Sequence, residues 1–365
     1  MRLLICAGMT GGGVYPAIAV LQALEGNVDE VLWIGSQSGM EETLLKNYKV
    51  SYQSIPAAGL HGVGLRALPA NLFQLYRGWR QSRRLIAHFQ PHVMFFTGGY
   101  LGVPVALAGR RIPSVVFVPD IEPGLALKTI LRPARKVALS CEDSLPYVPA
   151  SKAVVTGYPV RKEMTQWSRE SARAHFGLPV DARVLLGFGG SKGARSINNA
   201  LAACLPDLLQ NMHVLHISGK DNWAEVQAMA AELPKNLREH YHAFPFLHED
   251  MGAAFAAADL AICRSGASTL GELPAFGLPA ILVPYPHAWR YQRQNAEYLA
   301  RRGGAVILED GLLMEKMKTM ITSIMNNEPE LARMRAAMTR VSSPDSASRI
   351  ADLVRAAGGR AGGGK

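Results

Sequence analysis

Short apolar segments alternate with helical stretches along the whole chain, and this alternation limits the possible folds more than any other feature. The segments are rich in valine, isoleucine, leucine and phenylalanine, which is typical of strands in parallel sheets whose two faces are covered by helices. The predicted strands are "RLLICAG", "EVLWIGS", "HVMFFTGG", "SVVFVP", "KVALS" and "AVVTG", followed by "RVLLGFGG", "HVLHISG", "HAFPF", "LAICRSG" and "PAILVPYP".

The series of strands starts twice, which predicts two α/β domains. The chain has 365 residues and is too long for one typical core. A polar, proline-containing stretch separates the two series at about residue 162. We therefore expect two Rossmann-like parallel-sheet domains, over residues 1–161 and 162–365, that face a cleft. The second domain would end in a helix over about 345–357, followed by a disordered glycine-rich tail.

The composition narrows the class of partner. The net charge of +10 favours a phosphorylated substrate or an anionic membrane surface. The sequence contains no nucleic-acid-binding module, so we expect no nucleic-acid partner. The cysteines are scattered without paired spacing, which predicts buried free thiols in a reducing cytosol and no metal site. No apolar run is long enough to span a bilayer, so we expect a cytoplasmic protein, unless it binds a membrane from the inside.

A glycine-rich loop follows the first strand of each predicted domain. These loops are "GMTGGG" over residues 8–13 and "GFGGSKGARSINNAL" over residues 187–201. Glycines allow backbone N–H groups to approach an anion, and the start of the next helix adds partial positive charge. In the second loop, Ser191 adds a hydroxyl group. One such loop alone is equally compatible with a tight turn, but the repetition favours a phosphate-bearing donor in one domain and a second ligand in the other.

Polar residues in the second half are typical of a nucleotide-sugar site. The segment "RSGAST" leads into a predicted helix that carries Glu272, whose carboxylate could accept hydrogen bonds from the vicinal hydroxyls of a ribose. Gln292 lies at another helix start, where its amide suits sugar hydroxyls. Arg161 could neutralise a phosphate near the domain boundary. Ordinary capped helices and a surface ion pair would explain these residues equally well. The start of the Glu272 helix, which could bind a diphosphate, comprises Ala267, Ser268 and Thr269.

The segment over residues 60–89 combines leucines and aromatic residues with several arginines. A basic amphipathic stretch of this kind suits an interface with anionic lipid. An ordinary amphipathic helix with solvated arginines is the alternative. We favour the membrane interpretation, in which this segment brings the first domain to a lipid-linked acceptor.

Taken together, these motifs resemble the MurG family of membrane-associated N-acetylglucosaminyltransferases of peptidoglycan synthesis. The resemblance covers nearly the whole chain and rests on "GSQSGMEETLL", "GLHGVGLRAL", "TGGYLGVP", "TGYPVR", "GGSKGARSIN", "HISGK", "CRSGAST" and "YQRQNA". It implies the GT-B glycosyltransferase fold and inverting transfer of N-acetylglucosamine from UDP-N-acetylglucosamine. The acceptor would be undecaprenyl-diphospho-N-acetylmuramoyl-pentapeptide (lipid I), which becomes lipid II at the cytoplasmic face of the cell membrane. No metal or other cofactor would be needed.

The resemblance also implies roles for individual residues of the donor site, which the second domain would provide. Glu272 would hold the ribose, and Gln292 would hold the sugar hydroxyls. The backbone around Phe246 and Leu247 would frame the uracil.

Other implied roles concern the donor diphosphate and the first domain, which would hold the acceptor. Ser191 and Arg161 would lie near the diphosphate. The first-domain side of the sugar site would consist of Thr10, Gly11 and Gly12.

The sequence departs from the family where a general base is expected. Gly13 stands in place of the family's histidine, and the family's H-E-Q-N stretch reads "FVPD" over residues 117–120. Asp120 or Glu122 could accept the proton of an acceptor hydroxyl, and we choose Asp120. Asp120 could instead cap a helix beginning near Pro123, or the chemistry could rest on positioning and leaving-group stabilisation.

Three alternative functions remain open at this point. One is a related glycosyltransferase with another lipid acceptor, such as a glycolipid synthase. Another is a UDP-N-acetylglucosamine epimerase of the same fold, against which the basic amphipathic stretch and the "GGYLGVP" segment argue. The third is a nucleotide-sugar-binding protein without turnover, which would explain the loss of the family's histidine and glutamate.

Overall fold

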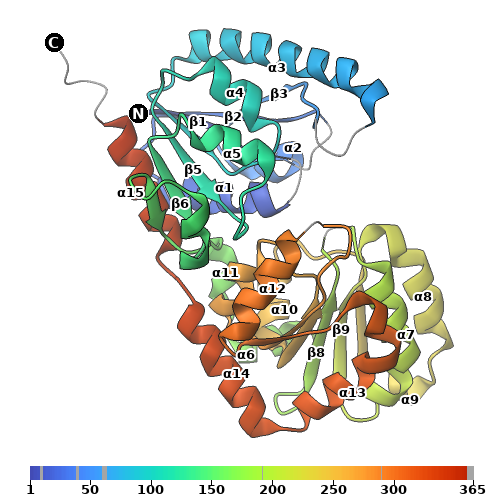
Figure 1. The fold of residues 1–365 in the computed structure, drawn as a ribbon. Coiled ribbons are helices and arrows are strands. Elements are labelled where there is room, and N and C mark those ends of the chain that lie inside the picture. Colours follow the sequence, from blue (N-terminus) through green and yellow to red (C-terminus); the bar gives the residue numbers. More distant parts are fainter. Residues whose placement is uncertain (9–10, 38–40, 60–63, 191, 289, 360–365) are drawn as a thin grey trace. The chain divides into compact units, whose positions relative to one another are not determined.

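The structure is a computed structural model that describes the chain apart from residues 9–10, 38–40, 60–63, 191, 289 and 360–365. The chain forms two compact units, which we call unit 1 and unit 2 (Figure 1). Unit 1 comprises Met1–Arg161 together with Ser343–Lys365, and unit 2 comprises Lys162–Ser342. The division falls after Arg161, next to the boundary named from the sequence. The expectation that the second domain extends to residue 365 is wrong, because the C-terminal segment belongs to unit 1.

The described part of unit 1 contains a sheet of seven parallel strands in the order β3-β2-β1-β4-β5-β6-β7. The central strands β1, β4 and β5 are buried along all or nearly all of their length, as expected for a sheet covered on both faces, whereas β3 and β7 at the edges are largely not buried. Their bounds are β1 Arg2–Cys6, β2 Glu30–Ser36, β3 Ser51–Ile55, β4 Val93–Phe96, β5 Ser114–Val118, β6 Lys136–Leu139 and β7 Ala153–Val155.

Helices cover the sheet of unit 1 and bury its apolar side chains. The longest, α3, packs against α4, while α15 packs against α1 and against β4 and β5. Ser346 at the start of α15 is buried and donates a 2.8 Å hydrogen bond to the carbonyl oxygen of Tyr158. The bounds are α1 Gly11–Ala23, α2 Glu41–Leu44, α3 Leu68–Phe89, α4 Gly102–Ala108, α5 Leu125–Leu131 and α15 Ser346–Gly358.

Unit 2 repeats this architecture, with six parallel strands in its described residues in the order β10-β9-β8-β11-β12-β13. The strands are β8 Val184–Phe188, β9 His213–Ile217, β10 Tyr241–Phe244, β11 Leu260–Cys263, β12 Ala280–Leu282 and β13 Ala305–Ile307. The helices are α6 Arg169–His175, α7 Arg195–Leu208, α8 Trp223–Glu232, α9 Lys235–Arg238, α10 Met251–Ala257, α11 Thr269–Ala275, α12 Tyr291–Arg301, α13 Leu313–Met325 and α14 Glu328–Val341.

These sheets confirm the prediction of two Rossmann-like parallel-sheet units. Two strands, β3 and β13, were not predicted, and each lies at one edge of its sheet. β3 is a polar segment that is covered on fewer sides, so it lacks an apolar run, whereas β13 is a short apolar segment that the prediction overlooked. The four cysteines are free and buried, as predicted. Within the described residues, no helix is both long and apolar enough to cross a bilayer.

Candidate active site

The strand order gives each unit one candidate site. In unit 1, β1 and β4 are neighbours, and the order runs outward from them in opposite directions. In unit 2, β8 and β11 stand in the same relation. Ligands of open α/β sheets bind beyond the carboxyl ends of the strands at such a reversal. Both glycine-rich loops follow a strand at this place, β1 in unit 1 and β8 in unit 2.

The loop between β8 and α7 depends on glycine. Gly190 has a φ of +91° and Gly193 a φ of +83°, a region that side chains disfavour. A Cβ atom on Gly193 would lie 2.0 Å from the carbonyl oxygen of Ser218, so a larger residue does not fit there. The described first turn of α7 has no acidic residue, so its N–H groups can bind an anion. Ser191, predicted near the diphosphate, lies outside the described residues.

A buried histidine is hydrogen-bonded to a residue that contacts the wall of this loop. His216 in β9 is fully buried, with Nδ1 2.6 Å from the hydroxyl of Tyr241 and Nε2 3.0 Å from Oδ1 of Asn198. Burial lowers the pKa of His216 to about 4, so the ring is neutral at pH 7. Asn198 also donates from Nδ2 to the carbonyl oxygen of Ser218 over 2.9 Å. This is the atom against which Gly193 packs, so the network fixes the wall of the loop.

The segment "RSGAST" after β11 forms a tight turn into α11. The hydroxyl of Thr269 donates a 2.6 Å hydrogen bond to the carbonyl oxygen of Gly266. The N–H of Glu272 donates to the carbonyl oxygen of Ser268 over 2.8 Å, which continues the helix. Ala267 and Ser268 are half-buried, as is Glu272 itself. The turn after β11 therefore leads to Glu272 in the first turn of α11.

Gln292 in the first turn of α12 is tied to two loops. Its Oε1 accepts a 2.9 Å hydrogen bond from the N–H of Tyr285, and its carbonyl oxygen accepts a 2.8 Å hydrogen bond from the hydroxyl of Ser265. Asn295 donates from Nδ2 to the carbonyl oxygen of Ser265 over 3.1 Å. Since the amide oxygen is engaged, Nε2 is the group with which Gln292 can donate to a sugar hydroxyl.

Phe246 and Leu247 follow β10, at the edge of the unit 2 sheet. Both are half-buried. The Nζ atom of Lys220, from the loop after β9, lies 5.7 Å from the centroid of the Phe246 ring. The ring of His248 packs edge-on at 4.4 Å between centroids. This end of the sheet offers an aromatic ring and a cation, which are groups suited to a flat base.

A charged cluster that the sequence analysis did not identify joins the loops of unit 2. We call it the Arg264 cluster, formed by Arg264, Asp310 and Ser196. The Nη1 atom of Arg264 donates to Oδ1 of Asp310 over 2.5 Å, and Nη2 donates to Oγ of Ser196 over 2.8 Å. Ser196 in turn donates to Oδ1 of Asp310 over 2.8 Å. The charge of Arg264 beside an apolar run was a visible signal, whereas Asp310 follows the unpredicted strand β13.

In unit 1, the glycine-rich loop leads directly into α1, whose first residues are Gly11 and Gly12. Thr10 lies outside the described residues. Thr97, directly after β4, donates from Oγ1 to the carbonyl oxygen of Gly13 over 2.6 Å. This hydrogen bond joins the residue after β4 to the first turn of α1. No role was predicted for Thr97, although it lies in the segment "HVMFFTGG".

A buried carboxylate lies against the same loop. Glu41 is fully buried and accepts hydrogen bonds at Oε1 from the N–H and the hydroxyl of Ser36, over 3.1 and 3.0 Å. A Cβ atom on Gly8 would lie 2.1 Å from that oxygen. A Cβ atom on Gly13 would lie 3.3 Å from the carbonyl oxygen of Gly8, so a side chain there requires a small shift. Burial, and after it the charge of Glu41, raises the pKa of Tyr52 to about 12.

The segment that departs from the family divides between strand and loop. Phe117 and Val118 are fully buried in β5 and belong to the core. Asp120 follows the carboxyl end of β5 and is half-buried. Glu122 is buried and pairs with Lys128, whose Nζ lies 3.0 Å from its Oε1. Asp120 is therefore the carboxylate closer to the strand end, and Glu122 is held by a cation.

Arg161, predicted near the donor diphosphate, belongs to unit 1. It is 8% exposed, and its guanidinium carbon lies 4.3 Å from the centroid of the Tyr15 ring in α1. Tyr158, three residues earlier, donates to the carbonyl oxygen of Gly12 over 3.4 Å and packs edge-on against Phe117. The end of the first half of the chain is thus anchored on α1.

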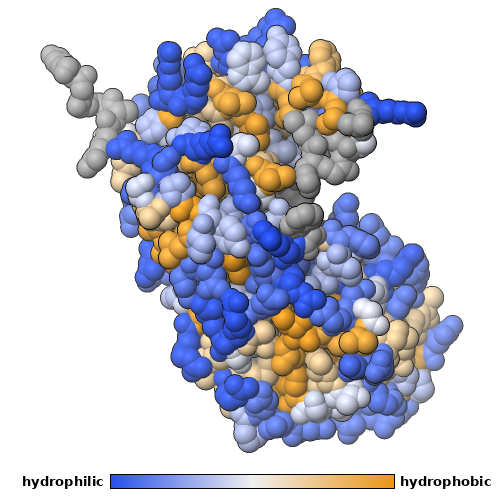
Figure 2. All heavy atoms as spheres, in the orientation of Figure 1, coloured by the Kyte–Doolittle hydropathy of each residue, from blue (hydrophilic) through white to orange (hydrophobic). Residues whose placement is uncertain are grey.

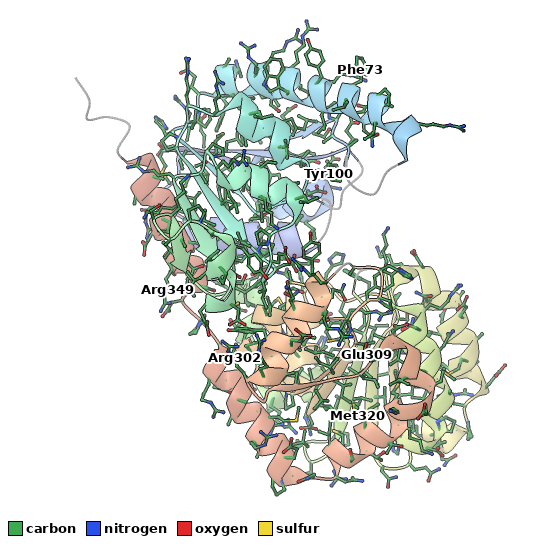
Figure 3. The ribbon with its side chains drawn as sticks, in the orientation of Figure 1. Phe73, Tyr100, Arg302, Glu309, Met320 and Arg349 are labelled. Atoms are coloured by element: carbon green, nitrogen blue, oxygen red, sulfur yellow. The ribbon has the colours of Figure 1, made fainter. Side chains whose placement is uncertain are left out.

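The outer side of α3 carries apolar and basic residues, which we call the α3 surface. Leu72, Phe73 and Tyr76 are more than half exposed, and Figure 3 labels Phe73 on this helix. The inner side packs closely, since a Cβ atom on Gly78 would lie 2.2 Å from the carbonyl oxygen of Pro56. Figure 2 shows hydrophobic and hydrophilic residues intermixed over α3. The arginines of the helix are Arg77, Arg80, Arg83 and Arg84.

The described residues contain no group of three or more histidine, cysteine, aspartate or glutamate side chains placed to hold a metal ion.

Two family models match the chain. The model of the glycosyltransferase family 28 N-terminal domain matches residues 3–139, within unit 1. The model of the family 28 C-terminal domain matches residues 184–350, a range that covers most of unit 2.

Relatives match over nearly the full length. The chain is 38% identical to the UDP-N-acetylglucosamine--N-acetylmuramyl-(pentapeptide) pyrophosphoryl-undecaprenol N-acetylglucosamine transferase of Roseiflexus sp. (strain RS-1), over 97% of this chain and 94% of that protein. The protein of the same name from Desulforudis audaxviator (strain MP104C) is 36% identical over 99% of both chains.

Solved structures agree with the family models. The crystal structure of Acinetobacter baumannii MurG matches with a TM-score of 0.76 and 28% identity, over 97% of this chain and 99% of that one. A UDP-GlcNAc 2-epimerase from Neisseria meningitidis matches with a TM-score of 0.70 but 12% identity, over 97% of this chain and 99% of that one, so it shares the fold alone. The matches confirm the predicted GT-B fold.

Proposed function

The chain belongs to the family of UDP-N-acetylglucosamine--N-acetylmuramyl-(pentapeptide) pyrophosphoryl-undecaprenol N-acetylglucosamine transferases, within glycosyltransferase family 28, and from this premise we propose its reaction. It transfers N-acetylglucosamine from UDP-N-acetylglucosamine to undecaprenyl-diphospho-N-acetylmuramoyl-pentapeptide. The anomeric carbon is inverted. The observation that carries the proposal is the pair of glycine-rich loops, each at the strand-order reversal of its sheet.

In this proposal, unit 2 holds the donor. The first turn of α7 and the loop that contains Ser191 receive the diphosphate, because uncompensated N–H groups stabilise negative charge. Glu272 accepts hydrogen bonds from the ribose, and Gln292 donates to the sugar. Phe246 and Leu247 frame the uracil. The start of α11, from Ala267 to Thr269, completes this side of the site.

Unit 1 holds the acceptor and receives its proton. The acceptor hydroxyl oxygen forms a bond to the anomeric carbon while the bond from that carbon to the diphosphate oxygen breaks. The electron pair leaves with UDP, and the hydroxyl proton passes to Asp120. The position of Asp120 just beyond β5 supports this role, because Phe117 and Val118 are buried in the strand and cannot take a proton. Thr10, Gly11, Gly12 and Arg161 are the residues of unit 1 that we assign to the donor.

The α3 surface is the part of unit 1 that we assign to the inner, anionic face of the cell membrane, where a lipid-linked acceptor is found. Exposed leucine and aromatic side chains beside arginines suit the boundary between headgroups and acyl chains. The protein would then be peripheral to the membrane. No nucleic-acid partner is proposed.

The transfer reaction can be tested directly. Purified protein is incubated with labelled UDP-N-acetylglucosamine and a short-chain lipid-linked muramoyl-pentapeptide, and label is followed into the lipid fraction. We expect transfer by the wild type. Glu272→Ala should raise the donor KM about tenfold or more, because it removes the carboxylate that accepts hydrogen bonds from the ribose hydroxyls. Glu315→Ala is the matched control, since Glu315 is an exposed glutamate of α13.

Each outcome has a defined meaning. Transfer with a donor-specific defect in Glu272→Ala supports the proposal. Tight donor binding without transfer to this acceptor contradicts it and favours another lipid acceptor or a nucleotide-sugar-binding protein without turnover. An equal effect of Glu272→Ala and Glu315→Ala would contradict the ribose assignment alone.

A further inference from the structure

We infer that Asp310 is a positioning residue for the donor site of unit 2, acting through Arg264 and Ser196 on the loop that receives the diphosphate. The inference rests on the proposed function for the identity of the ligand. It assigns a role to the one member of the Arg264 cluster that lies outside every motif quoted from the sequence.

The cluster connects the carboxyl ends of four neighbouring strands. Arg264 is the first residue after β11, and Ser196 is the second residue of α7, which follows β8 through the glycine-rich loop. Arg264 also donates from Nη1 to the carbonyl oxygen of Val283, just after β12, over 3.3 Å. Asp310 begins the segment after β13. One carboxylate oxygen, Oδ1 of Asp310, accepts from both Arg264 and Ser196.

The hydrogen bonds form a closed triangle. Arg264 donates to Asp310 and to Ser196, and Ser196 donates to Asp310. The side chains of Arg264 and Asp310 are 11% and 21% exposed, so the pair is largely shielded from water. Charge-assisted hydrogen bonds in such surroundings are strong and directional. The position of Ser196 is therefore restrained. Because Ser196 belongs to the first turn of α7, this turn is restrained as well.

The same geometry restrains the guanidinium of Arg264. Its Nη1 and Nη2 groups point to Asp310, Val283 and Ser196. Its guanidinium carbon lies 5.2 Å from the centroid of the Tyr285 ring. The backbone N–H of Tyr285 donates a hydrogen bond to Oε1 of Gln292. Asp310 thus orients a cation that contacts the loop of the sugar-binding Gln292 as well as the diphosphate loop. A site that is arranged before its ligand arrives binds it more tightly.

Loss of Asp310 should therefore weaken the binding of the nucleotide diphosphate. In Asp310→Ala, Arg264 and Ser196 lose their shared acceptor, and the first turn of α7 loses its restraint. We expect the dissociation constant for UDP, measured by calorimetry on the full chain, to rise about tenfold. In the transfer assay, the donor KM should rise by a similar factor while the acceptor KM stays unchanged, a split that a general loss of folded protein does not produce.

Glu309 provides a matched control. It is the preceding residue, and it also pairs with an arginine, with Oε2 2.6 Å from Nη2 of Arg293, but this pair is about half exposed. Figure 3 labels Glu309 in unit 2. Glu309→Ala should leave UDP binding unchanged, because exposed pairs contribute little. Ser196→Ala should weaken UDP binding less than Asp310→Ala, and the double variant should be non-additive, because both residues act through one triangle.

The results separate this inference from the proposed function. An unchanged dissociation constant for UDP in Asp310→Ala, or a fall in affinity equal to that of Glu309→Ala, overturns the positioning role. Additive effects of the Ser196 and Asp310 substitutions also overturn it. Wild-type protein that binds UDP but transfers nothing overturns the proposed reaction and leaves the UDP comparison decisive for Asp310. Thermal unfolding of each variant confirms that binding is measured on folded protein.

Discussion

Unit 1 and unit 2 share one topology, yet they hold their glycine-rich loops with different groups. In unit 2, the loop is held by the Arg264 cluster and by a neutral buried histidine network. In unit 1, the hydroxyls of Thr97 and Tyr158 donate to carbonyl oxygens in the first turn of α1, and the carboxylate of Glu41 lies against Gly8.

The difference shows how one fold can serve two chemical tasks. In unit 2, the carboxylate of Asp310 pairs with the cation of Arg264, so its negative charge is compensated near the first turn of α7, to which we assign the diphosphate. In unit 1, Asp120 follows β5, and Phe117 and Val118 before it are buried apolar residues that cannot take a proton. This contrast fits a diphosphate leaving group in unit 2 and a hydroxyl acceptor in unit 1.

The largest effect that we predict from this difference between the units is that of Asp120→Asn. We expect kcat to fall about 100-fold or more, because the amide cannot accept the hydroxyl proton. The donor KM should stay within twofold of wild type, since unit 2 is unaltered. Glu122→Gln is the control, because the Glu122 carboxylate is already paired with Lys128. Steady-state transfer kinetics decide the matter, and a kcat within threefold of wild type would remove Asp120 from the mechanism.

Low pH should lower the free energy of unfolding of unit 2, because His216 is buried in its neutral form. The folded-state pKa is lowered to about 4, so the unfolded state takes up a proton first as the pH falls below about 6.5. The stability linked to His216 is therefore full near pH 7 and is lost as the pH falls towards 4, by ~2–3 kcal/mol at pH 4.5.

Urea unfolding at pH 7 and pH 4.5 measures this loss. His216→Gln keeps a polar side chain but cannot titrate, so its free energy of unfolding should fall by ~2–3 kcal/mol less over the same interval. Equal losses in wild type and variant would mean that His216 does not control the acid sensitivity.

Alanine substitutions should show which positions of the unit 2 loop tolerate a side chain. Gly193→Ala would place a Cβ atom 2.0 Å from the backbone oxygen of Ser218. We expect Gly193→Ala to lower the free energy of unfolding by about 2 kcal/mol more than Gly190→Ala, which has the same backbone strain but open space around it. Denaturant titration tests this, and similar values for Gly193 and Gly190 would show that the loop adapts.

The smallest expected effect concerns the α3 surface. Arg80→Ala should weaken binding to anionic lipid vesicles by about 1 kcal/mol, or about fivefold, because one cation near the surface is lost. Lys316→Ala removes one exposed charge from α13 of unit 2 and should change nothing. Vesicle co-sedimentation at low and high salt provides the measurement. Equal losses for both variants would indicate a response to net charge without a defined membrane face.

Most of the fold follows from the sequence, because a parallel strand buried on both faces must be a short, continuous apolar run. β1, β2, β5 and β8 all have this signature. The half-exposed polar segment Ser51–Ile55 does not, and it forms a strand because the edge of β2 is available to pair with it. The glycine-rich loops were likewise readable, since a strand, several glycines and a helix start are consecutive in the chain.

What only the tertiary structure decided is which distant groups meet. The amphipathic pattern of α15 requires a buried face but cannot say which unit buries it, and the helix returns to unit 1, where Ser346 bonds to Tyr158 across 188 positions of sequence. Asp310 reaches Ser196 across 114 positions, after the edge strand β13 that was not predicted. Local sequence patterns show which positions of a helix or strand need to be buried. Which part of the molecule buries them depends on the packing of the whole chain.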